Sequence, residues 1–177
     1  AGLVIWAGAA PGDVFRALSS LTGVRGRMQL AATRKNGAAV YVDYAHTPDA
    51  VETALKALRP HVLGRIVIVF GAGGDRDTTK RPLMGAAARA HADVLYVTDD
   101  NPRSEDPAAI RAAILAGGAS KLMEVGDRRA AIAAGIDAAG RDDIVLIAGK
   151  GHEQGQIIGA GDSLRVVPFD DVTVARE

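Results

Sequence analysis

Short apolar runs alternate along most of the chain with segments in which apolar residues recur every three or four positions. The runs Arg65–Phe70 (RIVIVF) and Asp143–Ile147 (DIVLI) are typical of strands buried on both faces of a parallel sheet. The spacing of Val51, Leu55 and Leu58 predicts an amphipathic helix. Alternation of these two patterns is the signature of an α/β fold.

The same patterns predict the individual elements. Strands are expected over Met28–Thr33, Ala38–Asp43, Arg65–Phe70, Ala92–Val97, Leu122–Val125 and Asp143–Ile147. Helices are expected from Pro48 up to Pro60, from Pro82 to about Ala90, over Pro107–Leu115, from the cap Asp127 to Ala139, and from Asp170 onward. An Asn-Gly turn at 36–37 closes a first hairpin, and residues 156–167 form a second. This order predicts a three-layer α/β/α, Rossmann-like, doubly wound sheet, mostly parallel, with a hairpin or antiparallel strand at the edges.

The first 22 residues differ from the rest, because they read as two short helices with a break at residues 9–13. They are too few for a domain, and Gly23–Arg27 is a glycine-rich, basic segment typical of a hinge. The chain also does not start with Met. We therefore expect residues 1–24 to be the last helices of a truncated domain plus a hinge, and residues 25–177 to be a second domain.

Composition excludes several classes of protein. Lys+Arg and Asp+Glu are both 21 among 177 residues, which argues against a nucleic-acid partner held by bulk charge. The absence of cysteine excludes disulfides and cysteine-bound metals and is compatible with the cytoplasm. No apolar stretch approaches the ~20 residues of a membrane helix, so we expect no membrane insertion.

Four polar stretches each follow an expected strand: Asp43–Asp49, Gly71–Lys80, Thr98–Arg103 and Ala148–Glu153. The carboxyl ends of parallel strands share one edge of a doubly wound sheet, and ligands bind at that edge. We therefore expect the four stretches to converge on one site.

The stretch Thr98–Arg103 combines acids, an amide, a proline and an arginine. Pro102 fixes its own φ and restricts Asn101, so the loop is expected to be rigid. The planar fork of Arg103 suits a ligand carboxylate. The alternative is an ordinary turn with a solvated arginine.

The glycines of Gly71–Gly74 could place backbone amides near an anion, with Arg76 as a second candidate for a carboxylate. The segment matches neither the P-loop nor the dinucleotide fingerprint, so a flexible turn in which Asp75 and Asp77 pair with Arg76 is the alternative.

Tyr44 and His46 could stack on a base or polarise a phosphate, although such a histidine often bonds only within its own turn. No second His or Cys lies at zinc-ligand spacing, so no metal site is expected. Glu153 could accept hydrogen bonds from a ligand ammonium, and the alternative is a solvated Lys150–Glu153 pair. Two arginines, an asparagine and a glutamate together fit an amino-acid-like ligand with more than one carboxylate.

Five motifs in a fixed order carry a resemblance to a known family: Gly26-Arg27-Met28, Asp43–Asp49, Gly73–Asp77 with Lys80-Arg81-Pro82, Asp100–Arg103 and Gly149–Glu153. From about residue 23 onward the chain resembles the C-terminal domain of Mur ligases of the MurE type, and residues 1–22 look like the end of their central ATPase domain. One departure is Ala72, where many relatives have Cys.

The resemblance implies ATP-dependent amide ligation in peptidoglycan synthesis in the bacterial cytoplasm. The D-Glu carboxylate of UDP-MurNAc-L-Ala-D-Glu becomes an acyl phosphate, which the amine of meso-diaminopimelate attacks. ATP and Mg²⁺ are bound mainly by the central domain. The D-N-P-R form of Asp100–Arg103 marks diaminopimelate enzymes, and a buried Arg103 facing lysine would be left unpaired at a cost of roughly 3–5 kcal/mol.

The resemblance also implies residue roles. Diaminopimelate would be held by Arg76, Asp100, Asn101, Pro102, Arg103, Gly149 and Glu153. The nucleotide would be contacted, on domain closure, by Arg27, Asp43, Tyr44 and His46. No catalytic residue and no metal ligand is expected in this chain, which would be inactive without the N-terminal and central domains.

Three alternatives remain open at this point. The chain could belong to a lysine-adding or folylpolyglutamate-type ligase, although the intact D-N-P-R motif argues against both. It could also be a non-catalytic amino-acid-binding module. A nucleotide-binding Rossmann domain would need a glycine fingerprint that the sequence lacks.

Overall fold

Six strands form the main sheet, in the order β1-β2-β6-β3-β4-β5. The computed structural model describes residues 1–118 and 122–177. The strands are β1 (Gln29–Thr33), β2 (Ala39–Asp43), β3 (Ile66–Phe70), β4 (Val94–Val97), β5 (Leu122–Glu124) and β6 (Ile144–Ala148). β1 is antiparallel to β2 at one edge, and the other neighbours are parallel.

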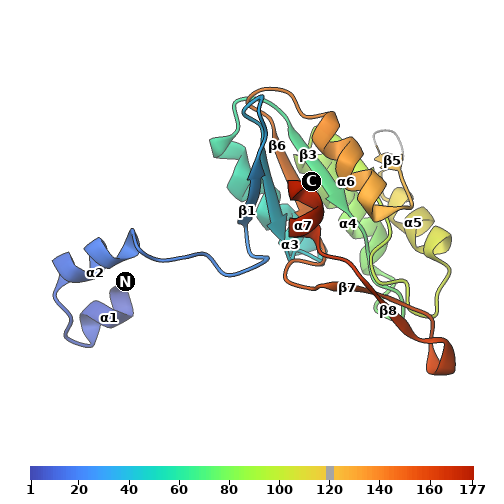
Figure 1. The fold of residues 1–177 in the computed structure, drawn as a ribbon, viewed down its shortest axis with the longest axis horizontal. Helices are drawn as coiled ribbons and strands as arrows, with labels where there is room; N and C mark the ends of the chain where they lie inside the picture. The colour runs from blue at the N-terminus through green and yellow to red at the C-terminus, as the bar shows by residue number, and fades with distance from the viewer. Residues whose placement is uncertain (119–121) are drawn as a thin grey trace.

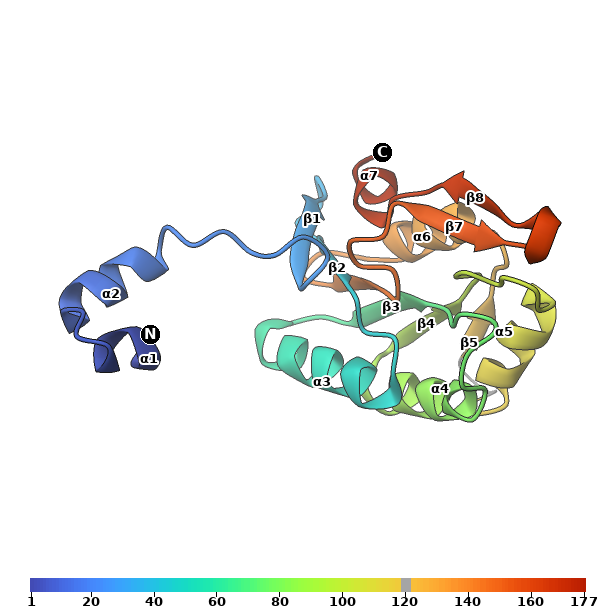
Figure 2. The same cartoon turned by 90° about the horizontal axis from the view of Figure 1, so that it is seen from below.

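Helices cover both faces of this sheet, which makes three layers (Figures 1 and 2). One face packs against α3 (Pro48–Leu58), α4 (Lys80–His91) and α5 (Pro107–Leu115). The opposite face packs against α6 (Arg128–Asp137) and α7 (Asp171–Arg176). The predicted three-layer, mostly parallel α/β fold is confirmed.

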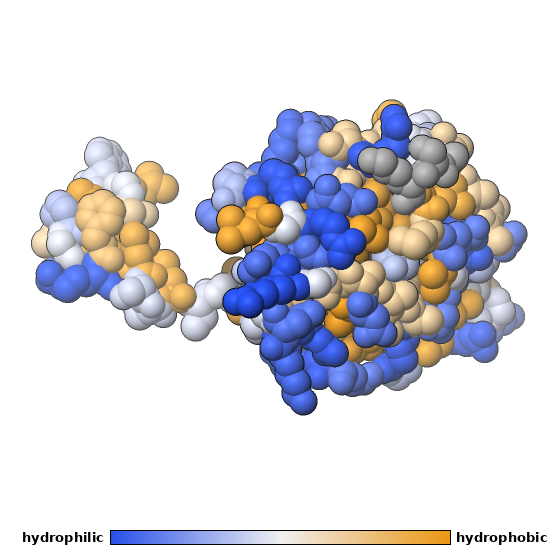
Figure 3. Space-filling model, turned by 90° about the horizontal axis from the view of Figure 1, so that it is seen from above, coloured by the Kyte–Doolittle hydropathy of each residue, from blue (hydrophilic) through white to orange (hydrophobic). Residues whose placement is uncertain are grey.

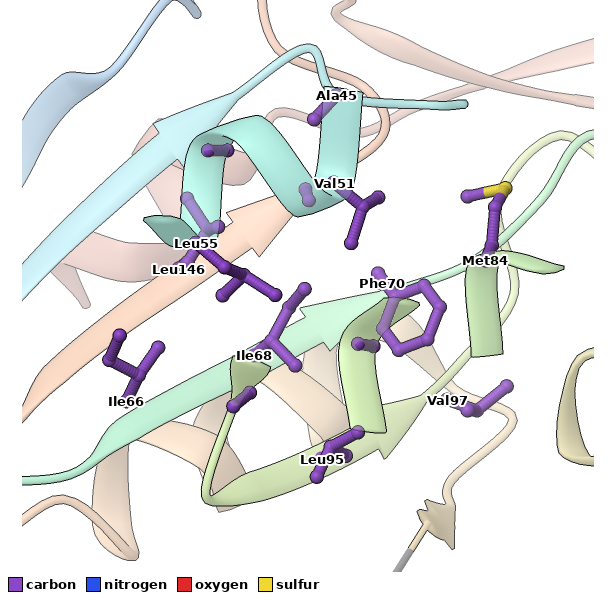
Figure 4. Packing of buried hydrophobic residues seen from close by; sticks show 14 of the residues in the cluster. Ala45, Val51, Leu55, Ile66, Ile68, Phe70, Met84, Leu95, Val97 and Leu146 are labelled. Atoms are coloured by element: carbon purple, nitrogen blue, oxygen red, sulfur yellow. The ribbon is translucent and has the colours of Figure 1, made fainter. Parts of the chain in front are cut away.

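The core lies on both sides of β3, which is why that strand is apolar throughout. Ile68 and Phe70 point toward Leu55 and Met84 on one face (Figure 4), while Val69 joins the core under α6 on the other. Successive side chains of a strand point to opposite faces, so a strand covered twice needs no polar residue. Truncating a side chain as buried as Ile68 to alanine is expected to cost about 2–5 kcal/mol.

Helices α3, α5 and α6 each begin at a side-chain cap. The side-chain oxygens of Thr47, Asp106 and Asp127 accept hydrogen bonds from the first-turn amides of α3, α5 and α6. The prediction that α4 begins at Pro82 was wrong by two residues, since α4 begins at Lys80. Pro82 is tolerated there because the first-turn amides of a helix have no intrahelical partner.

The second hairpin does not extend the main sheet. Strands β7 (Gly155–Ile158) and β8 (Arg165–Pro168), joined through the short 3-10 turn η2 (Gly161–Ser163), form a separate antiparallel pair. The backbone of Arg103 pairs with β7: its N–H donates to Ile157 O at 3.0 Å, and its carbonyl accepts from Gly159 N at 2.7 Å. The hairpin is therefore attached to the loop after β4 instead of to a strand edge.

Residues 1–22 form two short helices, α1 (Gly2–Trp6) and α2 (Pro11–Leu18), as expected. They lie apart from the sheet at the end of an extended segment (Figure 1), and apolar surface is visible on them (Figure 3). The exposed apolar side chains include Leu3, Val4, Trp6, Phe15, Leu18 and Leu21. Within residues 1–118 and 122–177, no helix has the length and apolar character needed to cross a membrane.

Candidate functional site

The four predicted loops meet at the carboxyl edge of the parallel strands. The loop after β4 contacts the loop after β6 through a hydrogen bond from Asn101 Nδ2 to Glu153 Oε2 at 2.8 Å. The loop after β2 contacts the same β6 loop, since the Tyr44 and His152 ring centroids lie 5.2 Å apart. This convergence follows from strand direction, and the prediction is confirmed.

Asn101 is the centre of these contacts. Its side chain is buried, and its Oδ1 accepts hydrogen bonds from Lys150 Nζ at 2.7 Å and from Ile157 N at 3.0 Å. With Nδ2 bound to Glu153, the amide joins the β4 loop, the β6 loop and the β7 hairpin. Asn101 therefore organises the site, and its oxygen is already occupied by two donors.

Lys150 is fully buried, so the alternative of a solvated Lys150–Glu153 pair was wrong. Its ammonium lies within 3.2 Å of three acceptors: Asn101 Oδ1, Gly155 O and Asp100 Oδ1. Burial lowers the pKa of Lys150 from its ordinary value, and the neighbouring charge of Asp100 opposes that change. No sequence pattern distinguished this lysine from a surface one, because its burial depends on the hairpin folding over it.

The Asp100 carboxylate packs closely against the backbone of Gly149. Asp100 is buried and gives one carboxylate oxygen to Lys150. Gly149 has φ +116, and a Cβ added to it would lie 2.6 Å from Asp100 Oδ2. A side chain at position 149 would therefore both strain the backbone and displace Asp100.

Arg103 is held in a defined geometry by its neighbours. Its φ is +52, an unusual value for a residue with a side chain, and its pairing with β7 holds it there. Its Nη1 donates to Gly74 O at 2.8 Å, and Gly73 allows this approach because a Cβ there would lie 2.7 Å from Nη1. Pro102, the preceding residue, is buried. The half-buried guanidinium retains further donors for a ligand.

Arg76 is not brought into the same cluster. Its side chain is exposed, and its Nη1 donates to the carbonyl of its neighbour Asp75 at 3.1 Å. Asp75 bonds to Ser104, and those hydrogen bonds lower the pKa of its carboxyl. The suggested pairing of acids with Arg76 is thus replaced by an Asp75–Ser104 contact that ties the β3 loop to the β4 loop.

The residues predicted to contact a nucleotide form an aromatic and cationic cluster beside the hinge. The Arg27 guanidinium lies 4.6 Å from the Tyr44 ring centroid, a cation–π distance. The His46 ring lies 4.5 Å from Tyr44, and its Nδ1 is 2.9 Å from the Tyr44 carbonyl oxygen, the local contact that the alternative interpretation expected. His152, which the sequence analysis did not single out, packs on the same ring.

Asp43 has a structural role in this cluster. Its two carboxylate oxygens accept hydrogen bonds from Met28 N at 2.7 Å and Ala45 N at 2.8 Å. It therefore holds the hinge side of the site to the loop after β2, and Arg27 is positioned beside Tyr44 as a result.

A buried ion pair supports the edge from the α6 side. Arg128 donates from Nε and Nη2 to the two oxygens of Asp171, both at 2.8 Å, and neither side chain is exposed. Arg128 Nη2 also donates to Ala148 O at 3.0 Å, at the end of β6. Burial opposes the charge, yet Asp171 outweighs it and raises the pKa of Arg128. Sequence reasoning missed this pair because its members are 43 residues apart.

Residues 26–151 match the family model described as "Mur ligase, glutamate ligase domain", which is more than half of the chain. The chain belongs to the Mur ligase family.

Two relatives of this Mur ligase domain share one name. The chain is 57% identical over 177 residues to the UDP-N-acetylmuramoyl-L-alanyl-D-glutamate–2,6-diaminopimelate ligase of Zymomonas mobilis, covering 100% of the chain and 36% of that protein. It is 56% identical over 172 residues to the Caulobacter vibrioides protein of the same name, covering 97% and 34%. The chain thus spans about a third of the length of the curated relatives it matches.

Solved structures agree with this assignment. A ligase structure of the same name matches with a TM-score of 0.78 and 42% identity, over 97% of this chain and 34% of that one. MurC from Thermotoga maritima matches with a TM-score of 0.65 at 20% identity, over 99% and 34%, which shows a shared fold.

The geometry of this Mur ligase domain defines what it can bind. Arg103 offers a cation, and Glu153, whose side chain is a third exposed, offers an anion that is bonded to Asn101 Nδ2. Within residues 1–118 and 122–177, no group of three or more His, Asp or Glu side chains is placed to hold a metal ion. The site therefore suits a small zwitterion recognised by charge-assisted hydrogen bonds.

Proposed function

We propose that this domain binds meso-diaminopimelate for an ATP-dependent ligase that joins it to UDP-MurNAc-L-Ala-D-Glu in bacterial peptidoglycan synthesis. The observation that carries the proposal is that Arg103, held by its bond to Gly74 O, and Glu153, held by Asn101 Nδ2, lie in loops that meet at one edge of the sheet, on a chain 57% identical to a ligase of that name. Arg103 is proposed to grip the carboxylate at the distal end of the diamino acid, and Glu153 to accept from an ammonium.

The remaining contacts are assigned by their position. Four residues are proposed to shape the site and hold its charged members, because they are buried or closely packed: Asp100, Asn101, Pro102 and Gly149. Arg76 is exposed on the neighbouring loop. Its side chain is proposed to move toward the ligand when the ligand binds.

The nucleotide contacts are proposed at the hinge. The cluster of Arg27, Tyr44 and His46 fits a nucleotide, since a flat ring and a cation can meet a base and a phosphate. The rest of the ATP and Mg²⁺ site is assigned to a preceding domain. When bound, ATP and Mg²⁺ supply activation of the D-Glu carboxylate as an acyl phosphate, and this domain delivers the attacking amine.

We further propose that residues 1–24 belong to that preceding domain together with the hinge. The exposed apolar side chains of α1 and α2 support this, because such a patch is normally covered by another part of a protein (Figure 3). The 177-residue chain alone is then expected to bind meso-diaminopimelate weakly and to catalyse no ligation, since domain closure assembles such sites.

The test compares meso-diaminopimelate with L-lysine in the full-length ligase and in an Arg103→Met variant. Loss of a charge-assisted hydrogen bond costs about 1.5–3 kcal/mol, so kcat/KM for meso-diaminopimelate should fall roughly 10- to 150-fold. Arg165→Met, at an exposed position of β8, is the matched control and should change kcat/KM less than about twofold.

Three outcomes would contradict the proposal. Equal use of both amino acids by the wild type would remove the diaminopimelate specificity. Preference for lysine would favour a lysine-adding ligase. Amino-acid binding without any ATP-dependent product in the full-length protein would favour a binding module.

A further inference from the structure

Lys150 is the one lysine whose side chain is fully buried among the described residues, and it faces the site without reaching its surface. Its ammonium has three N–H groups and three acceptors: Asn101 Oδ1 at 2.7 Å, Gly155 O at 2.9 Å and Asp100 Oδ1 at 3.2 Å. With all donors used, Lys150 has none left for a ligand. A buried lysine is costly to keep charged, and the three acceptors around the Lys150 ammonium offset that cost.

The contacts of Lys150 determine how the Asn101 amide is oriented. The position facing the ammonium must be an acceptor, which places Oδ1 toward Lys150 and Nδ2 toward Glu153. The opposite orientation would bring two donors together. Ile157 N–H also points at Oδ1, but it belongs to β7, whose first residue Lys150 holds through the Gly155 carbonyl.

The oriented amide in turn positions the acid. Asn101 Nδ2 donates to Glu153 Oε2 at 2.8 Å, and the Lys150 ammonium lies 3.9 Å from the same oxygen. One oxygen of Glu153 is therefore held on the inner side, while the side chain stays a third exposed toward the site. The second oxygen remains for a ligand ammonium.

We propose that Lys150 is a positioning residue of the amino-acid site: it orients Asn101, which in turn holds Glu153 so that its second oxygen can receive the ammonium of the diamino acid. The proposal rests on the proposed function and adds a residue that does not touch the substrate. A competing explanation is that Lys150 only neutralises buried Asp100.

The test uses Lys150→Met in the full-length ligase. The KM for meso-diaminopimelate should rise roughly 10- to 100-fold, the size of one lost charge-assisted hydrogen bond, while the KM for ATP stays within about twofold. Lys56→Met, which removes an exposed lysine of α3 paired with Glu52, is the matched control and should change neither. An unchanged KM in Lys150→Met would overturn the proposal.

A second pair of variants separates positioning from neutralisation and guards against misfolding. Lys150→Met combined with Asp100→Asn leaves no unpaired buried carboxylate, and it is compared with Asp100→Asn alone. If Lys150 positions the site, the double variant keeps the raised KM relative to Asp100→Asn. Equal KM values in the two variants would show that neutralisation is its whole function.

A third readout does not depend on ligation. In the 177-residue chain, hydrogen exchange of the Asn101 Nδ2 protons, followed by NMR, should be at least roughly tenfold faster in the double variant than in Asp100→Asn. Asn36, whose Nδ2 donates to Ala139 O, is the internal reference. A full-length wild type that ligates no diamino acid would refute the proposed function, whereas unchanged exchange at Asn101 would refute the role of Lys150.

Discussion

Replacing Arg128 with methionine tests whether the buried ion pair supports the functional edge of the sheet. Arg128 and Asp171 form two hydrogen bonds of 2.8 Å with no exposure of either side chain. The pair connects the first residue of α6 to the first residue of the C-terminal helix α7, and it also reaches the end of β6 through Ala148 O. Methionine keeps much of the volume and removes all of these donors.

The magnitude follows from what remains behind. In Arg128→Met, Asp171 is a buried carboxylate without its cation, and breaking a buried pair in this way costs about 3–5 kcal/mol. A domain of this kind has a free energy of unfolding of about 5–15 kcal/mol, so the loss is a large fraction of it. Replacing both members with apolar residues, as in Arg128→Met with Asp171→Leu, should recover most of the loss because no charge is left unpaired.

The measurement is urea unfolding followed by far-UV circular dichroism at pH 7. The single tryptophan, Trp6, is a poor probe, because it lies exposed in α1 away from the sheet. Arg129→Met is the matched control, since Arg129 is the next residue and pairs with Glu177 with both side chains more than half exposed. The control should cost less than about 1 kcal/mol. Equal losses in the two variants would refute the reasoning that burial makes the difference.

Three further tests probe other parts of the domain. In Gly149→Ala, the free energy of unfolding in urea should fall by about 1–3 kcal/mol and the KM for the diamino acid should rise, because φ is +116 and the new Cβ meets Asp100. Gly161→Ala, at φ +53 in open space, is the control: its free energy of unfolding should fall by only about 1–2 kcal/mol and its KM should not change. Burial favours the neutral form of Asp143, but hydrogen bonds from two backbone amides and a guanidinium outweigh it and lower its pKa. The stability that Asp143 contributes is therefore present above the unfolded pKa of about 4 and is lost as pH falls through the lower folded value. The difference in free energy of unfolding between wild type and Asp143→Asn should therefore be large at pH 7 and small in acid. A difference independent of pH would contradict this. Tyr44→Ala should raise the KM for ATP while Tyr44→Phe should not, and an unchanged KM in Tyr44→Ala would remove this ring from the nucleotide site.

The location of the candidate site could be predicted from the sequence, but its internal hydrogen bonds could not. Asn101, Arg103 and Glu153 were identified because polar residues directly after buried strands must share one edge of the sheet. Their internal arrangement was not predictable, since Asn101 proved to bond Lys150 and the β7 backbone. Which donor meets which acceptor is set by distances of a few ångströms between loops, and no spacing along the chain encodes them.

The sequence by itself determined the α/β fold, most element boundaries and the edge at which the site lies. Those features depend on local periodicity, on caps such as Thr47 and on strand direction, and each of these is set by residues close together in the sequence. Only the tertiary structure decided that Lys150 is buried, that Arg128 pairs with Asp171, and that the last hairpin attaches to Arg103 instead of to the sheet. The burial of a charged side chain and the pairing of distant charges depend on residues that meet in space after the chain has folded, so local pattern carries no signal for them.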